Sequence, residues 1–142
     1  MLLRADTKVE LIRGLPLFDL CSKRDLRRIA ALAVEQHLDE GTELIREGEP
    51  GTEFFVVVDG EVDVRRRGRR IARLGAGSYV GEIALLSRSP RTATVVAATP
   101  LHVIAIAGRD FVELLDAIPE LWLKVARTLA DRVDADEAAE AG

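Results

Sequence analysis

Glycine, glutamate and arginine occur between positions 77 and 95 at a spacing that can hold an anionic ligand. Gly81 permits backbone turns and close approaches that a Cβ atom would obstruct, and residues 82–86 favour a helix. The first amide groups of such a helix lack intrahelical acceptors and, with the helix dipole, attract negative charge. Arg91 follows the helix-ending Pro90, and a guanidinium can bind two phosphate oxygens. The stretch therefore predicts a phosphate site.

Glu82 needs its own explanation, because a carboxylate repels a phosphate unless it binds another group of the same ligand. A ribose hydroxyl is one such group. The alternative is that Glu82 stabilises its own helix start, by about 0.3–1 kcal/mol, and that Arg91 only pairs with it. The residue types alone leave both interpretations open.

The elements around this stretch indicate a single α+β domain over residues 1–142. Of these residues 48% are hydrophobic, which suits one globular domain with its own core. From about Gln36 the hydrophobic period changes to two and glycine-containing turns recur. We expect N-terminal helices over 1–35, a β-rich part over 36–107 and C-terminal helices over 108–138.

Local signals predict the helices near both ends. Thr7 and Glu10 form a capping-box pattern ahead of a helix that ends at Gly14, and Ser22 can cap a second helix. Two amphipathic helices, separated at Pro119, are expected near the C-terminus. Their apolar faces comprise Phe111, Leu114, Leu115 and Ile118, and then Trp122, Val125, Ala126, Leu129 and Val133.

The strands are predicted from alternation and from turn residues. The run 54–64 reads as a hairpin around the Asp59-Gly60 turn, with Val62 and Val64 buried while Asp63 faces water. A second turn at Gly68 leads into another strand. Strands 93–98 and 101–107 are apolar on both faces, so we expect them to be central.

Composition and charge exclude several classes of partner. The net charge of −4 and the 4% aromatic content argue against a nucleic-acid binder. Cys21 is the only cysteine, so no intramolecular disulfide can form. The N-terminus lacks the apolar core of a signal peptide, and no apolar run approaches the ~18 residues of a membrane span. We therefore expect a cytoplasmic protein with neither a membrane nor a nucleic-acid partner.

The remaining polar residues show no catalytic or metal-binding pattern. His37 and His102 lie far apart in sequence without ligand spacing, and no Ser-His-Asp or Cys-His set stands out. We expect no metal site and no enzyme. Five arginines flank Gly68, and we interpret them as a solvated hairpin tip because no aromatic residue lies among them. These are Arg65, Arg66, Arg67, Arg69 and Arg70.

The string GEIALLSRSPRTATV at positions 81–95, preceded by Gly-Ala-Gly-Ser-Tyr-Val, resembles the phosphate-binding cassette of cyclic nucleotide-binding domains. That family includes domains of cyclic-nucleotide-dependent kinases, nucleotide-gated channels and the catabolite activator protein. The resemblance implies an antiparallel eight-stranded β-roll with N-terminal helices, an inserted phosphate-binding helix and two C-terminal helices.

The resemblance also implies roles for individual residues. Backbone amides of Gly81, Ile83 and Ala84 would lie near the ligand, while Glu82 would bind the ribose 2′-hydroxyl. Arg91 would pair with the cyclic phosphate, and the Thr92 hydroxyl would lie near the phosphate and the purine. Further residues expected at the base are Val64 and Ala72, as purine-lining positions, and Arg132 of the last helix, as a lid.

The resemblance implies a regulatory module that binds cyclic AMP or cyclic GMP and signals through movement of its C-terminal helix. No cofactor is expected besides this ligand, and the output would pass to an unidentified effector protein. A DNA-binding regulator would need a helix-turn-helix after the last helix, which we do not expect here. The alternative is a degenerate member of the same fold that binds no nucleotide and serves as an interaction module. The preferred nucleotide and the oligomeric state stay undecided.

Overall fold

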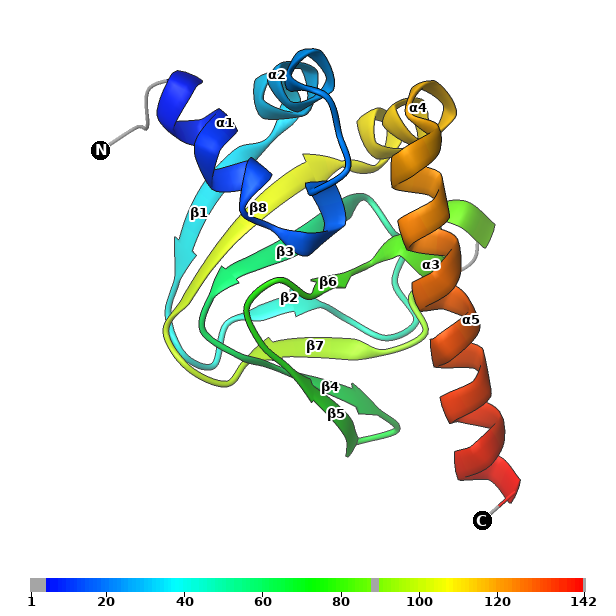
Figure 1. The fold of residues 1–142 in the computed structure, drawn as a ribbon. Helices are drawn as coiled ribbons and strands as arrows, with labels where there is room; N and C mark the ends of the chain where they lie inside the picture. Colours follow the sequence, from blue (N-terminus) through cyan, green and yellow to red (C-terminus); the bar gives the residue numbers. More distant parts are fainter. Residues whose placement is uncertain (1–4, 88–89, 142) are drawn as a thin grey trace.

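The structure, a computed structural model, describes residues 5–87 and 90–141 (Figure 1). Two helices and a single 3-10 turn come first: α1 (Ala5–Arg13), η1 (Pro16–Phe18) and α2 (Lys23–Leu32). Eight strands follow in the described ranges, with α3 (Glu82–Ser87) inserted before the seventh. The chain then continues into α4 (Gly108–Ala117) and α5 (Pro119–Ala141).

The eight strands form two antiparallel sheets of four strands each. The first sheet has the order β1-β8-β3-β6, and the second has the order β2-β7-β4-β5. The predicted α+β roll with an inserted helix is therefore confirmed, and β7 and β8 are internal as expected. The strand bounds are β1 Val34–Leu38, β2 Glu43–Ile45, β3 Glu53–Asp59, β4 Val62–Arg66, β5 Arg69–Leu74, β6 Tyr79–Val80, β7 Thr94–Ala97 and β8 Leu101–Ala107.

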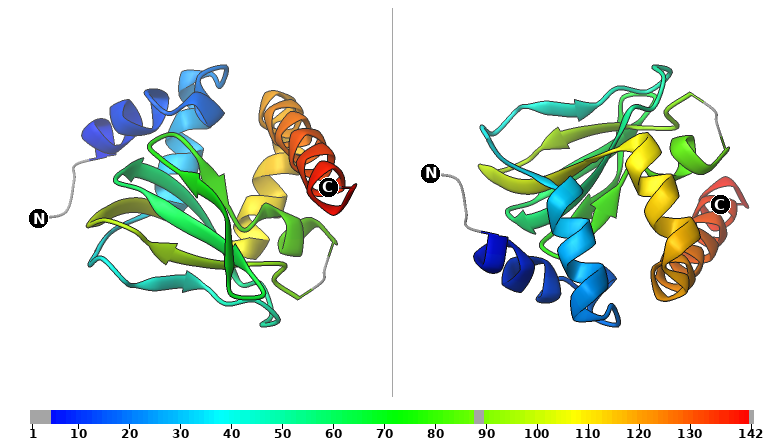
Figure 2. Two further views of the ribbon diagram at one scale, coloured as in Figure 1. Left: turned by 90° about the horizontal axis from the view of Figure 1, so that it is seen from below. Right: turned by 90° about the horizontal axis from the view of Figure 1, so that it is seen from above.

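The first sheet is the middle of three layers. Phe54 of β3 and Ile104 of β8 pack into a core with α1, α2, α4 and α5, whereas Phe55 and Val103 face the second sheet. Side chains alternate between the two faces of a strand, so β3 and β8 are buried on both sides. Figure 2 shows the N- and C-terminal helices gathered on one side of the two sheets. The inserted helix α3 joins β6 of the first sheet to β7 of the second.

The N-terminal helices agree with prediction except at the first cap. Ser22 caps α2 as predicted, because its Oγ accepts a 3.1 Å hydrogen bond from the Asp25 amide. The first helix ends at Arg13, directly before Gly14, also as predicted. The capping box was wrong, since α1 already begins at Ala5 and Thr7 lies within it.

The hairpin predicted over residues 54–64 was wrong. β3 and β4 follow each other in sequence but belong to different sheets. Gly60 has a φ of +95°, yet a Cβ there would lie 2.4 Å from the Pro100 carbonyl oxygen, so close packing also demands this glycine. The second predicted turn is a true hairpin: β4 pairs with β5 across Arg67 and Gly68, both with positive φ.

The apolar face of α4 is confirmed, while that of α5 is corrected at its start. Leu121 and Val125 are fully buried, whereas Trp122 is 47% exposed. Leu121 therefore takes the place predicted for Trp122, while Val125 and Leu129 of the predicted face pack in or against the core. The helix continues through Ala141, three residues beyond our expected boundary at 138. Among the described residues, no helix has the length and apolar character needed to cross a bilayer.

Candidate functional site

Gly81 and Arg91 meet at the start of α3. Gly81 has a φ of +102°, and a Cβ atom there would lie 2.7 Å from Arg91 Nη1 and 2.9 Å from the Glu53 carbonyl oxygen. Any other residue would therefore combine backbone strain with a clash. α3 begins at the next residue, as predicted from the glycine and the helix-forming run. The glycine thus allows the arginine side chain to approach the helix start.

The Arg91 main chain is fixed independently of its side chain. Its amide donates a 2.8 Å hydrogen bond to the Glu49 carbonyl oxygen, and its own carbonyl accepts one of 2.8 Å from Gly48. The guanidinium donates through Nη1 to the Gly81 carbonyl oxygen at 2.8 Å and through Nη2 to that of Glu53. Arg91 is only 7% exposed. A rigid backbone therefore presents a buried guanidinium to the first turn of α3.

The charge of Arg91 is poorly compensated in this position. Burial lowers the pKa of the Arg91 guanidinium, and the negative charge of Glu53 opposes that effect. Both of its hydrogen bonds reach uncharged carbonyl oxygens. A buried charge is costly unless a counter-charge is close, so this position favours an anion. The guanidinium retains further N–H donors beyond the two in use.

The other predicted residues of the cassette differ in how far they are exposed to solvent. Glu82, the first residue of α3, is fully buried, and the backbone amides of Ile83 and Ala84 lie in the same first turn. The side chains of Ile83 and Ala84 lie outside the described part. Thr92 is exposed, and its carbonyl oxygen accepts a 3.2 Å hydrogen bond from Arg66 Nε. The predicted anion-binding groups are thus close together, with the carboxylate closed off from solvent.

The predicted purine-lining residues share a sheet with the strand that follows Arg91. Val64 of β4 pairs with Ala72 of β5 on one side and with Val95 of β7 on the other. Both predicted residues are half-buried. Arg132 lies in α5, but its side chain lies outside the described residues, so its role as a lid stays a prediction.

A hollow adjoins the first half of α5, and its described lining includes no predicted site residue. It lies between η1, the loop before β6 and α5. Lys124 links these elements: its Nζ is 2.7 Å from Asp19 Oδ1 and donates a 3.0 Å hydrogen bond to the Pro16 carbonyl oxygen. The Tyr79 hydroxyl also donates to the Lys124 carbonyl oxygen at 3.4 Å. Sequence analysis missed this link, because nothing in the helix pattern distinguishes Lys124 from a solvated lysine. The hollow is lined by Pro16, Leu17, Leu74, Gly77, Ser78, Tyr79, Lys124 and Thr128.

Asp63 is a buried carboxylate that we expected to face water. Arg73 binds it through Nε at 2.8 Å and Nη2 at 3.2 Å. This hydrogen bonding lowers the pKa of the Asp63 carboxyl, against the opposing effect of burial, and the charges of Arg70 and Arg65 add to it. The arginines around Gly68 are largely exposed, as expected, but two of them also lie within 4.0 Å of this carboxylate.

Comparisons with known proteins agree with the fold and identify the family. The sequence model of the cyclic nucleotide-binding domain family matches residues 35–117. This match covers more than half of the chain, and the chain belongs to that family.

One sequence relative and one solved structure illustrate the similarity to other proteins. A cAMP-dependent protein kinase regulatory subunit of Eremothecium gossypii is 33% identical over 124 residues, covering 87% of this chain and 27% of the relative. The structure of cAMP-bound PfPKA-R (141-441) is similar with a TM-score of 0.87 at 21% identity, covering 96% of this chain and 47% of that one.

A third similar protein is also known from a solved structure. The regulatory subunit of a cAMP-independent protein kinase A from Trypanosoma brucei has a TM-score of 0.81 at 24% identity, covering 88% of this chain and 45% of that one. At such identities the two structures show the shared fold alone. The chain spans between 27% and 35% of the length of the first curated relatives.

Proposed function

We propose that this domain binds cyclic AMP or cyclic GMP at the cassette and reports the ligand to an effector protein through α5. The observation that carries this proposal is the buried Arg91 guanidinium beside Gly81 at the start of α3. A cyclic phosphodiester carries one negative charge, which compensates the guanidinium without the second charge of a terminal phosphate. The role assigned to Glu82 is a hydrogen bond to the ribose 2′-hydroxyl.

The ligand must reorganise the cassette before it can bind in this way. The guanidinium donates to the Gly81 and Glu53 carbonyl oxygens, and the Glu82 carboxylate is fully buried. Binding therefore requires that α3 move relative to the backbone that carries Arg91. A ligand shifts such an equilibrium only if it binds the rearranged state more tightly. In this proposal the cassette therefore has two states, the one seen in the structure and a rearranged one that binds the ligand.

The proposed output element is α5, which Lys124 connects to η1. In the proposed mechanism α5 closes over the base once the cassette has moved, and Arg132 stacks on the purine. The moving helix changes the surface offered to an effector. The effector in this proposal is a separate protein that recognises the changed surface.

A thermal-shift experiment tests the binding proposal with three ligands. Cyclic AMP or cyclic GMP should raise the melting temperature, because a ligand that binds only the folded state stabilises it in proportion to the logarithm of its concentration over Kd. The 5′-monophosphate serves as the non-cyclic control and should have a much smaller effect. Equal shifts for all three nucleotides, or none for any, would contradict the proposal.

A second candidate function is an interaction module of the same fold that binds no nucleotide. It is favoured by the hydrogen bonds that Arg91 already makes with main-chain carbonyls, which tie the guanidinium to the protein itself. The thermal-shift experiment separates the two, since this candidate predicts no response to either cyclic nucleotide.

A further inference from the structure

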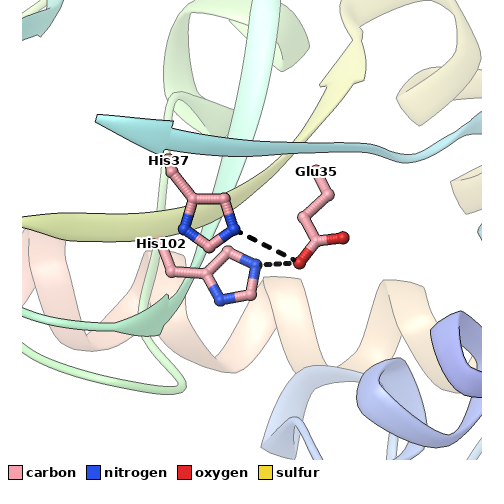
Figure 3. Close-up of side chains that lie close together, drawn as sticks. All are labelled: Glu35, His37 and His102. Carbon is pink, nitrogen blue, oxygen red and sulfur yellow. Dashed lines mark ion pairs between the residues drawn. The ribbon is translucent and has the colours of Figure 1, made fainter. Parts of the chain in front are cut away.

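Glu35, His37 and His102 converge on one face of the first sheet (Figure 3). In the register of β1 and β8, His37 lies directly opposite His102. Glu35 precedes His37 by two residues, so both side chains leave β1 on the same face. The two histidines have no ligand spacing in the sequence, and it is the pairing of β1 with β8 that brings them together.

The polar atoms of this cluster are close enough to share a ligand. Glu35 Oε1 lies 2.5 Å from His102 Nε2 and 3.7 Å from His37 Nε2. One ligand atom from each residue lies within 4.8 Å of the other two. The two imidazole rings stack with centroids 4.2 Å apart. The cluster therefore presents two nitrogen ligands and one oxygen ligand from a single small region.

His102 is the less exposed of the two histidines, with a side chain that is 19% exposed. Its Nε2 atom is buried and is in contact with Glu35 Oε1. His37, by contrast, has a side chain that is 74% exposed. The cluster thus combines a buried nitrogen at its base with an open approach from solvent.

We propose that Glu35, His37 and His102 bind one first-row transition-metal dication, for which Zn²⁺ is the best match. Two imidazoles and one carboxylate suit Zn²⁺ and its neighbours, whereas Mg²⁺ and Ca²⁺ prefer oxygen ligands. Three protein ligands leave a fourth tetrahedral position for water. The exposed side of His37 gives that position access to solvent.

The distances require only a small adjustment. Metal–ligand distances of about 2.0–2.2 Å put tetrahedral ligand atoms roughly 3.3 Å apart. The separation between Glu35 and His37 is near this value, while that between Glu35 and His102 must lengthen by roughly 0.8 Å.

A bound ion would link the edge strand β1 to the internal strand β8. Among the strands that the structure describes, β1 lies at the edge of its sheet and pairs with β8. The outer side of an edge strand presents backbone groups that no neighbouring strand pairs with. A metal bridge adds side-chain bonds to the one ladder that holds this strand. The ion therefore stabilises the sheet at a place that shares no residue with the cassette.

Isothermal calorimetry with Zn²⁺ on untagged protein tests the proposal. Wild-type protein should bind one equivalent, and His37→Ala, His102→Ala and Glu35→Gln should each weaken binding by about tenfold or more. The chain has no further histidine, so the double variant His37→Ala/His102→Ala should lose the site. Cys21→Ser and Glu40→Gln are matched controls and should bind as wild type does. Mg²⁺ should give no comparable heat.

Spectroscopy of the wild-type protein keeps the test independent of any variant. Co²⁺ should give the intense visible bands of a four-coordinate site, and Zn²⁺ should displace it. Amide resonances that change with Zn²⁺ should cluster in residues 34–38 and 101–105. The proposal is wrong if the double-histidine variant binds Zn²⁺ as tightly as wild type, or if the resonance changes lie elsewhere.

Discussion

At the scale of single residues, the site depends on how closely the Arg91 side chain approaches the backbone of Gly81. The distance from Nη1 to the Gly81 carbonyl oxygen is 2.8 Å, and the space beside it is too small for a Cβ atom. Gly81 therefore contributes to the site because it has no Cβ atom. The same contact limits how the guanidinium can turn when a ligand arrives.

Gly81→Ala should abolish this approach. The positive φ costs about 1–3 kcal/mol for a residue with a side chain, and the new methyl group displaces the guanidinium. We expect cyclic nucleotide affinity to fall by tenfold or more, measured by calorimetry. Gly41→Ala is the control, because Gly41 has a φ of +88° but a Cβ there meets nothing within 4 Å. It should lose stability yet keep its affinity, and an equal loss of affinity in both variants would contradict the assignment.

Asp63→Asn should destabilise the domain in a pH-dependent way. The hydrogen bonds from Arg73 hold the pKa of Asp63 below its ordinary value of 3.8. This stabilisation is complete above the unfolded-state pKa and disappears as pH falls through the folded-state pKa. Urea unfolding at pH 6 should show the variant to be less stable, with the difference shrinking as the pH falls below about 4. Asp59→Asn, at an exposed position, should show no such trend.

Residue types and spacing predicted the meeting of Gly81 and Arg91, because both belong to one short local stretch. They did not predict the burial of Asp63 or the pairing of His37 with His102. Those depend on which strands pair and in which register, and neither property is encoded within a single segment. The burial of Glu82 was also missed, since a carboxylate at a helix start is normally solvated.

At the scale of elements, Lys124 adds a polar link between α5 and η1 to the packing of Leu121 and Val125 in the core. Its ammonium group contacts both Asp19 and the Pro16 carbonyl oxygen, so a single side chain joins the last helix to η1. The pair is partly exposed, so each contact contributes about 1 kcal/mol or less. Such a contact is weak enough to be broken when a ligand moves the helix.

Lys124→Met should loosen α5 while leaving the sheets intact. Methionine keeps much of the side-chain volume but removes the charge and the donors. Hydrogen exchange followed by mass spectrometry should show faster exchange in α5, with β3 and β8 unchanged. Lys23→Met, on the exposed start of α2, provides the control. Unchanged exchange in α5 would show that Lys124 does not hold the helix.

Elements with local signals were predicted well, and those set by distant contacts were not. The cap at Ser22 and the hairpin at Gly68 are specified by a few neighbouring residues. The Asp59-Gly60 turn carries the same local signal as a hairpin, but the strands that it joins enter different sheets. The apolar run of β3 is buried on both faces, because the helices cover one face of the first sheet and the second sheet covers the other.

At the scale of the whole molecule, the two central strands differ from two of the helices in how they are packed. β3 and β8 are buried on both faces, whereas α3 and α5 lie at the margin of the sheets (Figure 1). Motion of the marginal helices need not disrupt the packing between the sheets. The architecture is therefore compatible with a switch whose stability resides elsewhere.

A ligand-induced shift of α5 should be visible in solution. Cyclic nucleotide should change amide resonances in α3 and in α5, because the two helices respond to one rearrangement. Resonances of α1 and α2 should change less. NMR spectra with and without ligand would decide this, and an unaltered α5 in a saturated complex would remove the proposed output while leaving the binding site intact.

The central claim is that Arg91 compensates the charge of a cyclic phosphodiester, and calorimetric titration of wild type and Arg91→Ala tests it most directly. Removing one partner of a buried charge pair should cost about 2–5 kcal/mol, or roughly thirtyfold or more in affinity. We predict measurable binding of cyclic AMP or cyclic GMP by wild type and a loss of that size in the variant. Equal affinity in the two proteins, or no binding by wild type, would contradict the account.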